Sequence, residues 1–410
     1  MHNNRNLSND RRYQFMNTNS AQRANFSVHL ANRRSVVPMT LILVVLVTII
    51  SPMFIGFSRH KNSSQTNLEL IDKYNDGIKN LTSDALEGII TLEKEYVIPE
   101  NILVCPKPDA SCYGKSTSAS DVEAALERAA SLGWANTDEV VWDPDIERWN
   151  NTPYEYYQDD TIFVVMWKEY INHAIYNFAE VFIAHPSQFK RMLTDNEFGS
   201  NTRTTPSVMA KSVNAVCAMS ADFYGYRGKG IVVYNRKLCR NNPGSLETMY
   251  LNGNGDFIFK KGNELGNDEQ LQKFIDDNDI LFSLSFGPVL VRDGKAVKSV
   301  MGYPIGQPDG HYARAAIGQV GKLHYLLCTV DGGVKMIKDP DLKEPGVMLI
   351  NVAKVYEAKG CINAYTLDGG QTATIVMDDH LFNRVGYGNE RQMSDIIYFA
   401  TAISKKGDSE

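Results

Sequence analysis

Three aspartates each follow a strand-like apolar run in this sequence. Asp222 ends the run AVCAMSA, Asp331 ends KLHYLLCTV, and Asp368 ends CINAYTL. Two glycines follow each of the last two acids, giving two Asp-Gly-Gly corners. One Asp-Gly pair alone is a common turn, but acids gathered at strand carboxyl ends are typical of a site built on a sheet. We therefore take these three carboxylates as candidate catalytic groups.

The second Asp-Gly-Gly corner carries groups suited to an anion. Glycines at such a corner let the backbone approach a ligand closely and expose N–H groups to a negative charge. Gly369 and Gly370 are expected to act in this way. Thr372 and Thr374 follow the corner and offer hydroxyl groups in the same place. These four residues are candidate substrate-binding groups.

Two arginines are candidate partners for the same anion. Arg314 lies in HYARAAIGQ and Arg391 in GNERQMSD. A guanidinium group matches phosphate oxygens in bidentate fashion, which makes arginine a suitable ligand for a phosphate. Each arginine has a second interpretation, as a surface residue or a packed ion-pair partner. The sequence alone leaves both interpretations open.

A predicted helix separates the last two acids. Apolar residues at Met348, Val352 and Val355, followed by Gly360, predict a helix over about residues 346–359. Strand, crossover helix and strand form a βαβ unit, and such connections join parallel strands. Both Asp-Gly-Gly corners are therefore expected at the same edge of the sheet.

Further elements complete a domain at residues 155–405. β-rich runs at 161–170 and 174–185 predict two strands joined by a short turn, and Asp293-Gly294 predicts a hairpin. Helices are expected from Thr205 onward and over 267–277. The sequence thus predicts a single α+β (mixed α/β) domain in which helices flank a mixed β-sheet.

These segments resemble a known family. RAAIGQVGKLHYLLCTVDGG and CINAYTLDGGQTATIV are similar to the signature region of the phosphodiester glycosidases, and LSFGPVLVRDGK resembles another block of that family. The likeness runs in order over about residues 155–405. Ser220-Ala221 stands where the family usually has Asn-Gly, and Gln371-Thr372-Ala373 replaces Gly-Ser-Ser.

The resemblance implies hydrolysis of a sugar linked through its anomeric carbon to a phosphodiester, such as an N-acetylglucosamine-1-phosphodiester. Arg314 and the Gly369-Gly370 amides would neutralise the departing phosphate. Asp368 or Asp222 would orient water at the anomeric carbon or stabilise charge there, as carboxylate pairs do in glycosidases. Asp331 completes the candidate catalytic set. A divalent cation held by these acids is a further option that the sequence does not establish.

Two functions of other classes remain open. The domain would bind glycans or phosphorylated polymers without cleaving them if the Ser220-Ala221 departure abolishes catalysis. Alternatively, it would act in exopolysaccharide assembly, as a transferase or a structural accessory. Hydrolysis of a sugar-1-phosphodiester separates the first function from these two.

The N-terminal quarter predicts a membrane anchor. Residues 36–57, VVPMTLILVVLVTIISPMFIGF, hold no charged residue over the length that a bilayer requires. The preceding tail, residues 1–35, lacks apolar periodicity and is expected to be disordered. Residues 58–154 are expected to be an extracytoplasmic spacer with short helices. The tail is rich in one charge, which places it in the cytoplasm and the later domain outside the cell membrane: Arg5, Arg11, Arg12, Arg23, Arg33 and Arg34.

Charge and cysteine content narrow the remaining classes. A net charge of -6 gives no basic field that would draw a nucleic acid to the surface. The expected partners are therefore the membrane and a phosphorylated glycan or sugar-1-phosphodiester. Cys105 and Cys112 lie seven residues apart in a loop and predict a local disulfide outside the membrane. No Cys or His spacing indicates a zinc site.

Overall fold

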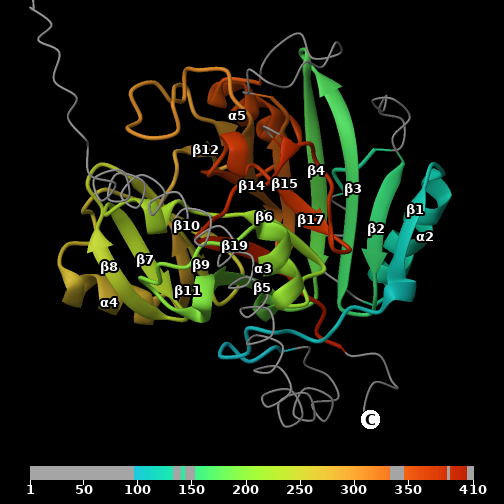
Figure 1. The fold of residues 1–410 in the computed structure, drawn as a ribbon, viewed down its shortest axis with the longest axis horizontal. Helices are drawn as coiled ribbons and strands as arrows, with labels where there is room; N and C mark the ends of the chain where they lie inside the picture. The colour runs from blue at the N-terminus through green and yellow to red at the C-terminus, as the bar shows by residue number, and fades with distance from the viewer. Residues whose placement is uncertain (1–96, 133–139, 144–152, 333–345, 386–387, 404–410) are drawn as a thin grey trace, which may run out of the picture. The chain divides into compact units, whose positions relative to one another are not determined.

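The computed structural model describes residues 97–132, 140–143, 153–332, 346–385 and 388–403 (Figure 1). The expected tail at 1–35, the apolar segment at 36–57 and the first part of the expected spacer, to residue 96, lie outside these residues. Among the helices that are described, none has the length and apolar character needed to cross a membrane.

A nine-stranded sheet organises the domain, in the order β1-β2-β3-β4-β15-β14-β16-β12-β13. Every pair of neighbours in it is antiparallel. The longest strands, β3 and β4, correspond to the two runs predicted at 161–170 and 174–185 (Figure 1). Both strands are buried along almost their whole length. The strands are β1 (Tyr113–Ser116), β2 (Tyr154–Gln158), β3 (Ile162–Ile171), β4 (Ala174–Ile183), β12 (Val289–Arg292), β13 (Lys295–Ala296), β14 (Arg314–Gly321), β15 (His324–Val330) and β16 (Asn363–Leu367).

Three smaller sheets pack beside it. A five-stranded sheet has the order β18-β17-β6-β19-β5, a three-stranded sheet the order β10-β9-β11, and β7 pairs with β8. Apolar side chains of the nine-, five- and three-stranded sheets share one buried cluster. The strands are β5 (Phe189–Leu193), β6 (Cys217–Ser220), β7 (Gly230–Tyr234), β8 (Lys237–Asn242), β9 (Glu247–Asn252), β10 (Phe257–Lys261), β11 (Ile280–Leu284), β17 (Ile375–Met377), β18 (His380–Leu381) and β19 (Asp395–Phe399).

Short helices cover the outer faces of these sheets. Helix α5 packs on β12, β13 and β14, α3 on β6 and β19, and α4 on β8. The predicted starts at Thr205 and Asn267 are the N-caps of α3 and α4. The helices are α2 (Ala119–Ser131), α3 (Pro206–Ser212), α4 (Asp268–Asp277) and α5 (Leu349–Ala358). The α+β class is therefore confirmed.

The predicted mixed sheet differs from the observed one in a specific way. Strands β15 and β16, which α5 connects, do run parallel, because both pair antiparallel with β14. Strand β14 lies between them, so they are not neighbours, and all pairings in the described residues are antiparallel. Both Asp-Gly-Gly corners still open at the same edge of the sheet. Arg314, the first residue of β14, starts at that edge as well.

Part of the expected spacer belongs to the folded domain. Strand β1 pairs with β2 at the sheet edge, and α2 packs on β1, β2 and β3. The Cys105 N–H donates to the Val213 carbonyl at 3.1 Å, which joins the segment before β1 to the end of α3. The predicted disulfide is absent: Cys105 and Cys112 are free thiols. Cys105 is instead buried against the apolar cluster that contains Met209.

A fully buried ion network joins two of the sheets. Arg191 on β5 donates to Asp395 on β19, with Nη2 to Oδ2 at 2.6 Å and Nε to Oδ2 at 2.9 Å. Its Nη1 donates to the Ser283 carbonyl on β11, in the three-stranded sheet. The side chains of Arg191 and Asp395 are both inaccessible to solvent. Because a buried charge is costly without its partner, this network fixes how the two sheets meet.

We predict that Arg191→Leu lowers the free energy of unfolding by about 3–5 kcal/mol, since it leaves Asp395 buried and unpaired. Lys211→Ala is the control, because the Lys211–Asp379 pair is mostly exposed and such pairs contribute less than about 1 kcal/mol. Urea titration of both variants measures the difference. Equal stabilities would show that the buried network does not hold the sheets together.

Candidate active site

A cavity of about 510 Å³ opens at the sheet edge where the strand-end residues gather. Its floor is the end of β16 and the following corner, with Thr366, Asp368 and Gly369. Arg314 stands on the neighbouring strand, in the position opposite Asp368, because the last register pair is Ala315 with Leu367. Aromatic rings and two further arginines complete the wall: Phe223, Phe286, Tyr303, Tyr312, Arg227 and Arg391.

Asp368 lines the cavity with a carboxyl group that has one oxygen without a hydrogen-bond partner. It is 8% exposed, and its Oδ2 atom accepts no hydrogen bond. Burial raises the pKa of Asp368 to about 7, although the Thr372 hydroxyl and the Arg391 guanidinium lower it. A carboxyl group with a pKa near neutrality exchanges protons readily at physiological pH. Asp368 therefore has the properties of a general acid or base.

The corner that carries Asp368 requires glycine for a steric reason. A Cβ atom on Gly369 would lie 2.7 Å from the Ala313 carbonyl oxygen on the approach to β14. The Asp368 N–H donates to the Ala221 carbonyl at 2.9 Å, which ties β16 to the end of β6. The corner is thus fixed from both sides, and the Asp368 side chain is directed by a rigid backbone.

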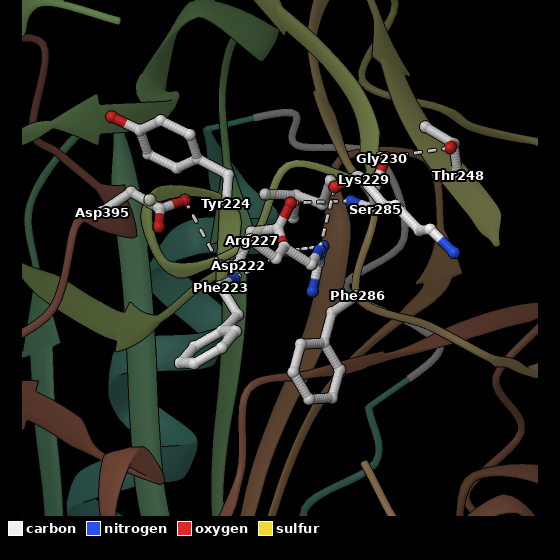
Figure 2. Close-up of polar contacts among 12 residues, drawn as sticks. Asp222, Phe223, Tyr224, Arg227, Lys229, Gly230, Thr248, Ser285, Phe286 and Asp395 are labelled. Carbon is white, nitrogen blue, oxygen red and sulfur yellow. Dashed lines mark hydrogen bonds and ion pairs between the residues drawn. The ribbon is translucent and has the colours of Figure 1, made fainter. Parts of the chain in front are cut away.

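Asp222 has the opposite electrostatic environment. Its Oδ1 accepts from Arg227 Nη2 at 2.5 Å and from the Phe223 N–H at 2.6 Å, while Oδ2 accepts from the Ser285 N–H at 2.9 Å (Figure 2). Burial alone would raise the pKa of Asp222, but Arg227, Arg191 and the two N–H groups outweigh it and lower the pKa. Asp222 is therefore a permanently ionised carboxylate that holds Arg227 in place.

Arg314 lines the cavity, but its hydrogen bonds go to the protein. Its guanidinium donates to the carbonyl oxygens of Val347, Gly306, Gln307 and Gly310. These bonds hold the loop that carries Tyr303 and Tyr312 into the cavity wall. No carboxylate pairs with Arg314 in the described residues, and burial lowers its pKa to about 10. Arg314 therefore positions a cavity loop and contributes an uncompensated positive charge.

Arg391 and Arg227 are the cations with capacity for a ligand. The Arg391 guanidinium lies 5.5 Å from the Phe223 ring centre and 5.1 Å from that of Tyr226. Neither a hydrogen bond nor an ion pair of Arg391 occurs within the described part of the chain. Arg227, which points from Asp222 toward Phe286 (Figure 2), has a buried Nη1 atom without a partner.

The other predicted site residues either lie outside the cavity or have polar groups that already bond to the protein. Asp331 accepts from Asn177 Nδ2 at 2.7 Å and from Arg384 Nε at 3.2 Å, one strand beyond β14. Thr372 and Thr374 are buried, and their hydroxyls donate to the carbonyl oxygens of Gly369 and Thr372. Gly370 lines the cavity, but its N–H already donates to the Ala313 carbonyl at 2.8 Å, so this amide is not available to an anion.

Sequence reasoning missed Arg227, Arg191 and Asp395. Arg227 lies five residues after Asp222 in ADFYGYRGKG, and this spacing was the one signal that could have linked it to the acid. Arg191 and Asp395 are far from Asp222 in sequence and become neighbours only because β5, β19 and β6 share a sheet.

Comparison with known proteins identifies the family. The model of the phosphodiester glycosidase family matches residues 213–400, the part of the chain that builds the cavity. Residues 213–400 therefore form a phosphodiester glycosidase domain.

Individual relatives of this phosphodiester glycosidase domain are distant. The chain is 26% identical over 208 residues to the SPbeta prophage-derived uncharacterized protein YomE of Bacillus subtilis, covering 50% of this chain and 31% of that protein. It thus spans about a third of that relative's length. The catalytic domain of zebrafish N-acetylglucosamine-1-phosphodiester alpha-N-acetylglucosaminidase, auto-inhibited by its pro-peptide, is 17% identical with a TM-score of 0.44, covering 58% and 82% of the two chains. A hypothetical protein from Synechocystis is 12% identical with a TM-score of 0.41, covering 62% and 64%.

The Ser220-Ala221 departure contacts the backbone of Asp368 and does not line the cavity. The Ala221 carbonyl accepts from the Asp368 N–H, and the Ser220 hydroxyl lies 3.4 Å from the Asp368 carbonyl oxygen. Both residues are buried and support the corner. In the described residues, no group of three or more His, Cys, Asp or Glu side chains is arranged to hold a metal ion.

The contrast between the two acids predicts stability changes of opposite sign. Because the pKa of Asp368 is raised on folding, its protonated form stabilises the fold fully below pH about 4, and this stabilisation is lost as the pH rises through about 7. The Asp368→Asn variant has no carboxyl group to ionise. Its free energy of unfolding should therefore exceed that of the wild type by an amount that grows from pH 4.5 to pH 8 and reaches at most about 4 kcal/mol. Asp222→Asn should instead destabilise at pH 8, because it removes a charge that Arg227 and Arg191 require.

Urea titrations of both variants and the wild type at these two pH values measure the effect. A loss of stability in Asp368→Asn at pH 8 would show that the carboxylate is needed by the fold and is not held there for function.

Proposed function

We propose that this domain hydrolyses the glycosidic bond of a sugar-1-phosphodiester, releasing the sugar and a phosphomonoester. The observation that carries the proposal is Asp368: a desolvated carboxyl with an unpartnered oxygen. It lies in a cavity that is also lined by Arg314 and Arg391, neither of which pairs with a carboxylate of the described residues. Family membership supports the same reaction class. We further propose that the sugar resembles N-acetylglucosamine, as the sequence resemblance to the phosphodiester glycosidases implies.

The charges around the cavity favour a phosphodiester. Four guanidinium groups, those of Arg191, Arg227, Arg314 and Arg391, accompany the three carboxyl groups of Asp222, Asp368 and Asp395. One positive charge is left over when all three acids are ionised, and two when Asp368 is protonated. A phosphodiester carries one negative charge, so it compensates this excess. Arg391 and the unpartnered Nη1 of Arg227 supply donors for its oxygens.

The reaction requires little help for the leaving group. A phosphate monoester departs far more easily than an alcohol, so the main demands are to activate water and to hold the departing phosphate. Asp368 in its ionised form takes a proton from the water that attacks the anomeric carbon. The carbon–oxygen bond to the phosphate breaks, and both electrons remain on the phosphate oxygen. Arginines stabilise that growing charge.

A glycan-binding domain without catalysis is the second candidate, motivated by Ser220-Ala221. Its supporting observation is weaker, because these residues lie beneath the corner and do not line the cavity. An exopolysaccharide-assembly role has no supporting contact among the described residues. Both alternatives predict binding without release of free sugar.

The position of bond cleavage tests the proposed reaction. The protein should hydrolyse the methyl phosphodiester of α-N-acetylglucosamine 1-phosphate in ¹⁸O-water and place ¹⁸O in the sugar, with none in the phosphate. Mass spectrometry of both products measures this. Label in the phosphate would mean attack at phosphorus and would rule out a glycosidase, while no turnover would favour a binding domain.

A matched pair of aspartates tests the catalytic assignment. Asp368→Asn should lower kcat about 10²- to 10⁴-fold, the usual contribution of a positioned acid or base. Asp331→Asn is the control, because Asp331 begins the other Asp-Gly-Gly motif and does not line the cavity. Wild-type kcat/KM should rise with pH to about 7 and then level off, since the ionised form of Asp368 is the active one. Activity that falls through pH 7 would assign Asp368 as an acid.

We also propose that residues 36–57 anchor the domain to the outer face of the cell membrane, where a cell-surface or exopolysaccharide glycan would be the substrate. The support is the uncharged length of the segment and the arginines before it. An N-terminal tag on intact cells should resist external protease, while a tag after Glu410 should be digested. The reverse pattern would overturn this orientation.

A further inference from the structure

Three buried polar atoms without partners border the cavity. Thr366 Oγ1, Asp368 Oδ2 and Arg227 Nη1 are all buried, and none forms a hydrogen bond. All three residues line the cavity. Because an unsatisfied buried polar group costs about 1–3 kcal/mol, such atoms at one cavity indicate groups that a ligand completes. Asp368 and Arg227 already have roles in the proposed reaction, whereas Thr366 has none.

The backbone of Thr366 is fully engaged, so its hydroxyl is the only unsatisfied group. Thr366 pairs with Ala316 on β14. On its other side, the Thr366 N–H donates to the Pro288 carbonyl at 3.1 Å and its carbonyl accepts from the Gly287 N–H at 3.2 Å. The residue is 2% exposed and cannot rotate into bulk solvent.

Thr366 and Asp368 share one face of the strand. Side chains alternate along a β-strand, so residues two apart point to the same side with roughly 7 Å between their Cα atoms. Arg314, opposite Asp368 on β14, belongs to this face as well. A group held by Thr366 is therefore about one sugar ring away from an atom that reacts at Asp368.

We propose that Thr366 determines the sugar specificity of the site. Its hydroxyl, which both donates and accepts, hydrogen-bonds a hydroxyl or acetamido substituent on the ring whose anomeric carbon lies against Asp368. This inference rests on the proposed function and adds to it the recognised chemical group. A buried site built to bind a substrate hydroxyl rejects an analogue that lacks it, because the protein group then stays unpaired.

Thr329 provides a matched control within the same sheet. It lies on β15, is completely buried, and its Oγ1 also has no partner. Unlike Thr366, it does not line the cavity. Thr329→Val and Thr366→Val therefore remove the same kind of hydroxyl, and neither breaks a hydrogen bond of the free protein. Both variants should keep the wild-type free energy of unfolding or exceed it.

Calorimetric binding of N-acetylglucosamine 1-phosphate and its analogues lacking the 2-, 3-, 4- or 6-substituent tests the inference without requiring turnover. Thr366→Val should bind the parent sugar phosphate about 10- to 100-fold more weakly than the wild type, while Thr329→Val binds normally. For one analogue, Thr366→Val and the wild type should bind equally, and that analogue identifies the recognised substituent.

Three results would overturn the inference: normal binding of the parent by Thr366→Val, an equal loss for every analogue, or no binding of any of these sugars by the wild type. The separate turnover assay distinguishes the proposed function from this inference. Normal specificity in binding, together with no release of free sugar, would reject the hydrolase and leave the role of Thr366 intact.

Discussion

The Asp222 carboxylate, accepting from Arg227, Phe223 and Ser285, connects the parts of the fold that build the cavity. It follows β6 of the five-stranded sheet, and its Ser285 partner follows β11 of the three-stranded sheet. Arg191, which pairs with Asp395 inside the five-stranded sheet, reaches the three-stranded sheet through its bond to the Ser283 carbonyl. Because these charges are buried, removing any one of them would leave its partner as an unpaired charge in the protein interior. The position of Arg227 in the cavity wall follows from this network.

Two acids at neighbouring strand ends thus acquire opposite protonation behaviour from their surroundings. Asp222 is saturated with donors and stays ionised, whereas Asp368 lies in a cavity with one oxygen unpartnered and titrates near neutrality. Environments that separate the pKa values of two carboxyl groups are how one fold supplies both a fixed charge and a proton acceptor. Burying Asp368 with one oxygen unpartnered lowers the stability of the fold. A fold that had no substrate to bind would not need this arrangement.

The sequence predicted the strand-end acids, the helix α5 and the common edge of the two corners, because apolar periodicity and Asp-Gly-Gly are local signals. It could not distinguish Asp331 from Asp368, which have identical local motifs. They differ because β14 lies between their strands, so that Asn177 and Arg384 reach only Asp331. Similarly, an arginine at position 314 suggested phosphate binding, but its guanidinium donates to three carbonyl oxygens of residues 306–310 and to that of Val347. These contacts depend on the tertiary fold and leave no local signal in the sequence.

The central claim is that burial, without an ion-pair partner to offset it, raises the pKa of Asp368 to about 7, while the nearby Asp222 stays ionised. Carbon-13 NMR of the aspartate carboxyl groups, titrated in the wild type and in Asp368→Asn, measures it directly. We expect one resonance that titrates near pH 7 and is missing from the variant, while Asp222 remains ionised down to pH values below the ordinary aspartate range. Titration of Asp368 at or below pH 4 would contradict the account.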